Sequence, residues 1–141
     1  MATWQLGPFD NDDAVEWCGV LDASTLDQHA DIARQTLETA VTAGRALTAG
    51  DAARAVAAAA TVLQSLTGVW VSDSAYAPRI LIGREGILIG PTLRDLAIRA
   101  LGVILAEGSA WRLRWADDIE EDEALAVIEK LRRDLVSTTL P

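Results

Sequence analysis

The chain has 141 residues, half of them hydrophobic, which is typical of a single domain with one core, here residues 1–141. Its 21 acidic residues outnumber 12 basic ones and give a net charge of −9. This balance argues against non-specific binding to nucleic acid or to an anionic membrane surface, because both depend on Lys and Arg. A single cysteine, Cys18, cannot form an internal disulfide and favours a reducing compartment.

The first 13 residues are polar and acidic, with neither the basic nor the apolar region of a signal peptide. No apolar run approaches the roughly 20 residues that a membrane helix needs. We therefore expect a cytoplasmic protein without a membrane partner.

Apolar residues at helical spacing dominate the sequence. The Asp-Asn-Asp-Asp run at residues 10–13 supplies N-caps for a helix over residues 14–21. Thr25 and Gln28 have the spacing of a capping box, and the apolar stripe behind them predicts a second helix that ends near Gly44. A third helix is predicted over residues 51–67, with Gly68 as its stop.

The fourth predicted helix, residues 92–106, has Thr92 as its cap and few polar interruptions, so we expect it to be the central helix. The fifth opens near residues 117–118 with an acidic first turn, and Glu129 and Arg133 are spaced to pair along it. The predicted fold class is mainly α, a compact bundle of about five helices.

The segment of residues 68–91 is too long to be a structureless loop in a compact domain, so we expect it to contain an element of its own. Two Ile-Leu-Ile triplets flank Gly-Arg-Glu-Gly at residues 80–90, which favours a short β-hairpin, with an irregular helical turn as the alternative. An isolated hairpin is marginally stable, so this one is expected to lie on the helices or to pair with another strand edge.

The N-terminal block resembles a known family. Its residues are Thr3, Trp4, Gly7, Phe9, Asp10, Asn11, Asp12 and, in the helix that follows, Trp17. The block is similar to the opening of the small bacterial family called domain of unknown function 4259, although Ala2 and Gln5 stand where that family has glycine. The resemblance extends over residues 93–105, 111–115 and 125–135. The resemblance implies a mostly helical fold and supplies no activity. The motif residues are therefore expected to have a structural role.

The Asp10–Asp13 run also has the oxygen ligands that calcium and magnesium prefer. An EF-hand loop is excluded, because Val15 and Leu21 occupy the positions where it needs glycine and glutamate. Helix capping explains the run with fewer assumptions, and a hydrophobic staple formed by Trp4, Phe9 and Trp17 is a third interpretation. We predict no metal, although an enzyme using Asp10, Asp12, Asp13 and Glu16 stays open as an alternative.

No other pattern indicates catalysis or a cofactor. His29, the single histidine, is interpreted as a surface or boundary residue of the second helix, and Cys18 as a small apolar residue. One cysteine and one histidine do not supply the four ligands of a structural zinc site. The glycines at residues 83, 86 and 90 match neither a phosphate loop nor a dinucleotide fingerprint.

Two groups of residues are candidates for an interaction surface. Trp111 and Trp115 share a face if their segment is helical, and either pack in the core or bind a partner. Glu120, Glu121, Asp122 and Glu123 form either a solvated first turn or a patch for a basic partner.

These features favour an acidic module that binds another protein, in the manner of an immunity protein or an antitoxin. The partner itself is unknown and is expected to be basic. A metal-dependent enzyme is one alternative. The other is a self-assembling structural protein that forms a homo-oligomer through residues 80–89.

Overall fold

The computed structural model describes residues 7–9, 11–68, 91–116 and 118–138. Helices dominate these ranges: α1 (Asp12–Ala23), α2 (Leu26–Ala43), the short 3₁₀ helix η1 (Gly44–Ala46), α3 (Ala49–Thr67), α4 (Pro91–Leu105), α5 (Ala110–Trp115) and α6 (Glu121–Ser137). The prediction of a mainly helical fold is therefore confirmed. The hairpin expected at residues 80–90 lies outside the described residues.

Helix α3 is the centre of the bundle. It packs against α1, α2, α4, α5 and α6, and its buried residues run without a break from Ala55 to Gln64. Half of these side chains are alanine, whose small size lets neighbouring helices come close. The expectation that residues 92–106 form the central helix was wrong, because α4 buries one face and exposes Asp95 and Arg99.

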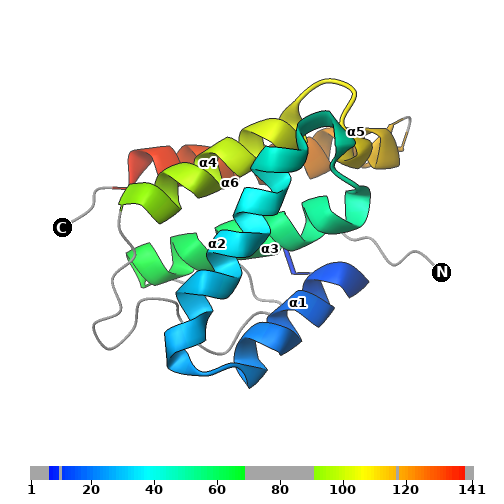
Figure 1. Cartoon of the computed structure of the whole chain (residues 1–141). Coiled ribbons are helices and arrows are strands. Elements are labelled where there is room, and N and C mark those ends of the chain that lie inside the picture. Colours follow the sequence, from blue (N-terminus) through cyan, green and yellow to red (C-terminus); the bar gives the residue numbers. More distant parts are fainter. Residues whose placement is uncertain (1–6, 10, 69–90, 117, 139–141) are drawn as a thin grey trace.

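The other helices surround α3 on several sides (Figure 1). Helix α1 lies on one side of α3, α4 and α6 lie on the opposite side, and α2 crosses both α3 and α4. Helices α4 and α6 are antiparallel: Arg94, near the start of α4, donates a 2.8 Å hydrogen bond to the carbonyl of Thr138, just beyond the end of α6. Further along the pair, Arg132 Nε donates to the carbonyl of Ile98 at 3.2 Å.

Polar residues and glycine mark several helix ends. The Asn11 side chain caps α1 by accepting from the N–H of Ala14 at 2.8 Å, and Ser109 caps α5 by accepting from Arg112 N–H at 3.1 Å. Gly68 ends α3 with a left-handed φ of 72°, a conformation that glycine adopts without strain. The backbone N–H of Thr25 donates to Gln28 Oε1 at 3.2 Å, as the predicted capping box requires.

Three predictions near the C-terminal half need correction. Helix α4 begins at Pro91 rather than Thr92, since proline suits the first helical position. Helix α6 begins at Glu121, three residues later than expected, after a turn in which Asp118 Oδ1 accepts from Glu120 N–H. The ion pair along α6 joins Lys130 and Asp134 at 2.6 Å, in place of the predicted pair one residue earlier.

Within the described ranges, none of the helices combines the length and hydrophobicity that crossing a membrane would require.

Candidate functional site

The described residues of the N-terminal block hold α1 against the rest of the bundle. Phe9 is fully buried, Asn11 caps α1, and Asp12 is exposed in its first turn. Trp17 is buried, and its indole Nε1 donates to Thr36 Oγ1 on α2 at 2.8 Å. Gly7 is half-buried. Trp4 and Asp10 lie outside the described residues, and Phe9, Asn11 and Trp17 have contacts that support the fold.

Asp13 joins α1 to the start of α3. Its carboxylate lies 3.0 Å from the guanidinium of Arg54, which also binds Asp51 at 2.8 Å. A Cβ atom on Gly50 would come within 3.4 Å of the same carboxylate, so Asp13 packs directly on the first turn of α3. Across the described part of the chain, no three His, Cys, Asp or Glu side chains gather in an arrangement able to hold a metal ion.

Cys18 and His29, the two residues with potential for nucleophilic or acid–base chemistry, are both buried. Burial raises the pKa of the Cys18 thiol to about 12, with a further contribution from the charge of Asp22. The thiol therefore stays protonated and unreactive at neutral pH. His29 Nε2 lies 3.1 Å from the carbonyl of Ser24, and because a carbonyl only accepts, Nε2 carries the proton.

Trp111 and Trp115 lie in the core, which agrees with the packing interpretation of this pair. They are 6% and 4% exposed, and their ring centroids are 6.4 Å apart. Leu113, between them on α5, is 66% exposed. The two tryptophans thus anchor α5 in the core, and Leu113 on its opposite face is exposed.

The acidic run lies just beyond α5, at the start of α6. Glu120, Asp122 and Glu123 are exposed and Glu121 is half-buried. Next to them Ile119 is 98% exposed, an exposure that the sequence pattern did not indicate. We call the residues Asp118, Ile119, Glu120, Glu121, Asp122 and Glu123 the acidic corner.

A groove that the sequence pattern did not indicate lies between α4, α5 and α6. Its volume is about 580 Å³, and its lining includes the side chains of Leu105, Leu125, Val136, Arg112, Arg132 and Arg133. We call it the arginine groove. A signal was present: Leu125, Arg132 and Val136 follow one another by seven and four residues, so they share a helix face beside the buried one. Apolar residues on that second face could have revealed it.

Comparison with known proteins places the chain in a family. No curated protein and no solved structure shows a significant match. A family model, described as a domain of unknown function (DUF4259), matches residues 2–127 and thus most of the chain. The resemblance seen in the N-terminal block is confirmed, and the chain belongs to the family of the domain of unknown function DUF4259.

Proposed function

We propose that the protein is a protein-binding module that docks a basic partner on its acidic corner. The observation that carries the proposal is Ile119, whose side chain is 98% exposed among acidic neighbours. Covering an apolar side chain that is exposed to water lowers the free energy, and this favours binding of a partner. The surrounding carboxylates would select a partner with Lys or Arg at matching positions.

The architecture beneath the corner supports this role. Trp111 and Trp115 anchor α5 in the core, and the Asp118 N–H donates to the carbonyl of Trp115 at 3.0 Å, which ties the corner to this helix. A preorganised surface loses less conformational entropy when it binds than a loose segment does. In this proposal the two tryptophans position the interaction surface and do not touch the partner.

Within this class we infer an immunity- or antitoxin-like role, in which the module covers a basic surface of its partner. The net charge of −9 supports the inference, because an acidic surface speeds the approach of a basic partner. The partner's function would then be controlled by masking.

The test is capture of partners from host lysate by the wild-type chain and by two variants with equal changes in charge. The corner variant carries Glu120→Gln, Asp122→Asn and Glu123→Gln. The control carries Glu16→Gln, Asp31→Asn and Glu38→Gln, which neutralise exposed acids on α1 and α2. We expect a basic protein to bind the wild type and the control, to be lost from the corner variant, and to dissociate as salt rises from about 0.05 M to about 0.3 M.

Equal capture by the corner variant and the wild type would contradict the proposal, as would a partner whose binding does not depend on salt. A further variant, Ile119→Ser, tests the apolar contribution separately. This substitution should weaken binding equally at high and at low salt, because the hydrophobic contribution does not depend on charge screening.

A further inference from the structure

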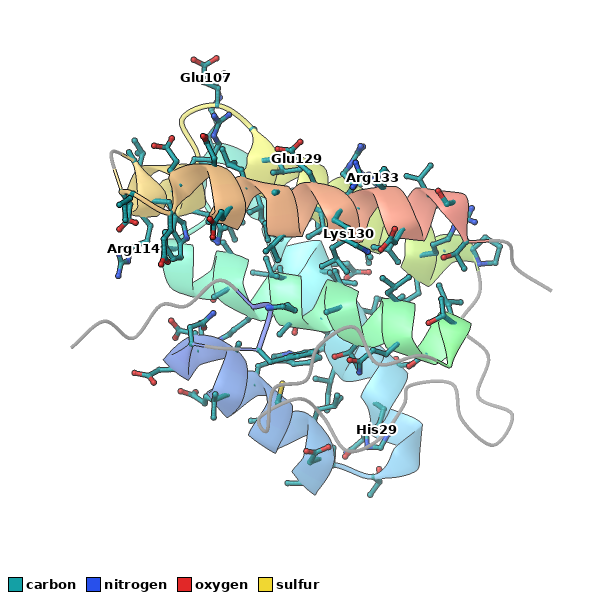
Figure 2. All side chains as sticks on the ribbon, turned by 180° about the vertical axis from the view of Figure 1, so that it is seen from behind. His29, Glu107, Arg114, Glu129, Lys130 and Arg133 are labelled. Atoms are coloured by element: carbon teal, nitrogen blue, oxygen red, sulfur yellow. The ribbon has the colours of Figure 1, made fainter. Side chains whose placement is uncertain are left out.

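The arginine groove is a positively charged site on a strongly acidic chain. Among the described residues, Arg112, Arg132 and Arg133 line it together with one carboxylate, Glu129. Figure 2 shows Glu129 and Arg133 on the same side of α6, with Lys130 on another side. Leu105, Leu125 and Val136 add an apolar lining, and Val136 is 57% exposed. The groove therefore suits an occupant that combines carboxylates with an apolar side chain.

Two of the arginines are held in place by α4. Arg112 donates from a terminal nitrogen to the carbonyl of Leu105 at 3.3 Å, and Arg132 Nε donates to the carbonyl of Ile98 at 3.2 Å. A guanidinium has five N–H donors, so each keeps donors for a ligand after its backbone contact. Arg133 has no ion-pair partner among the described residues, although Asp and Glu outnumber Lys and Arg in the chain.

The chain itself carries a segment with the required chemistry. In the acidic corner, Ile119 is 98% exposed beside Asp118 and Glu120, and further carboxylates follow in the first turn of α6. The corner presents acids around an isoleucine, and the groove presents arginines around leucine and valine. Arginine binds carboxylates with two parallel hydrogen bonds, which makes such a pairing specific in geometry as well as in charge.

We propose that the acidic corner of one copy docks in the arginine groove of a second copy. Ile119 would cover the apolar lining between Leu125 and Val136, and the carboxylates beside it would pair with Arg112, Arg132 and Arg133. The corner and the groove share no residue, so the contact joins unlike surfaces of the two copies.

The net charge of −9 on each copy opposes association at low ionic strength. At about 0.1 M salt the Debye length is about 10 Å, so repulsion across the whole molecule is largely screened while contacts between paired groups persist. The test is therefore made at this ionic strength, by sedimentation equilibrium from about 10 μM to about 1 mM protein, a range that reports micromolar to millimolar dissociation constants.

Three single-site or paired variants define the experiment. The groove variant is Arg133→Glu, chosen because this side chain has no other partner among the described residues. In this experiment the corner variant is a charge reversal, Ile119→Lys combined with Asp122→Lys, in place of the three neutralised acids used above. The control is Lys130→Glu, which makes a similar charge change on another side of α6. Thermal unfolding establishes that each variant is folded.

We expect the wild type and the control to associate, and each of the other two variants to associate at least tenfold more weakly. Mixing the groove variant with the corner variant should restore association, because the mixture contains one intact corner and one intact groove. A wild-type chain that stays monomeric at about 1 mM overturns the proposal. Association that survives both variants, or that mixing does not restore, also overturns it.

This inference shares the acidic corner with the proposed function, and Arg133→Glu separates the two. That variant should lose self-association and still capture a basic partner from lysate. If self-association is lost and capture is unchanged, both proposals stand. If the variant with three neutralised acids captures the partner normally while self-association follows the expected pattern, the proposed function alone fails.

Discussion

Thr36 connects α1 to α2 through a single hydroxyl group. Its Oγ1 accepts the hydrogen bond from Trp17 Nε1 at 2.8 Å and donates to the carbonyl of Ile32 at 2.9 Å. Trp17 is 5% exposed, so its indole N–H has little access to water. The hydroxyl thus keeps the buried indole N–H satisfied at the contact between α1 and α2.

We predict that Thr36→Val lowers the free energy of unfolding by about 1–2 kcal/mol, because it leaves the indole N–H without its partner. Thr36→Ser keeps the hydroxyl and is the matched control. Urea unfolding followed by tryptophan fluorescence measures both. In a Trp17→Phe background the same Thr36→Val change should cost much less, and an undiminished cost there would show that the bond is not the cause.

The structural roles of individual residues were partly predictable from the sequence. The Asp-Asn-Asp-Asp run before an apolar helix indicated several possible caps, and the structure shows that Asn11 is the residue that caps α1. The burial of His29 was not predictable, because a polar residue one position away from an apolar stripe is equally consistent with the surface. The exposure of Ile119 was not predictable either, because isoleucine is among the residues most often buried in folded proteins.

At the scale of elements, helix α3 is the least tolerant part of the bundle. Its alanines are almost completely buried, and helices on several sides pack against them. Such close packing leaves no space for a larger side chain, so any added volume must push a neighbouring helix away.

We predict that Ala58→Leu, at a fully buried position of α3, destabilises the protein by about 1–3 kcal/mol or more through overpacking. Ala126→Leu makes the same change at an exposed position of α6 and should stay within about 0.5 kcal/mol of the wild type. Thermal unfolding of the two variants decides the matter. Similar melting temperatures would mean that the alanine helix is packed less tightly than the structure indicates.

The positions of helices were predictable wherever the spacing of apolar residues agreed with residues that begin or end a helix. Gly44 and Gly68 were expected to stop the second and third helices, and both have positive φ angles just beyond those helices. Helix α5 was missed as a separate element because six residues are too few to display a period. The central position of α3 was missed because alanine contributes little hydrophobicity, although its small volume is what a crowded centre needs.

At the scale of the whole molecule, the net charge of −9 stores repulsive free energy in the folded state. The ion pairs do little to offset it, since pairs such as Arg34 with Asp31 and Lys130 with Asp134 are largely exposed. Exposed pairs contribute about 0–1 kcal/mol each. Screening the repulsion should therefore outweigh screening these attractions.

We predict that raising salt from about 0.01 M to about 0.2 M increases the melting temperature by a few degrees, as the Debye length falls from about 30 Å to about 7 Å. Sodium chloride and potassium chloride should act equally if screening is the cause. The melting temperature of the corner variant with three neutralised acids should rise less with salt than that of the wild type, because this variant has less repulsion to screen. A melting temperature that falls with salt would mean that attractive pairs dominate the electrostatics.

The burial of Cys18 has a practical consequence for studying this molecule in solution. Because its single native thiol is buried and protonated, maleimide reagents should reach it far more slowly than an exposed thiol. A cysteine introduced at Val20 or Leu113, both more than half exposed, would then take a fluorophore selectively without removal of the native one. Energy transfer between differently labelled copies would report association directly, in a protein that keeps its own core intact.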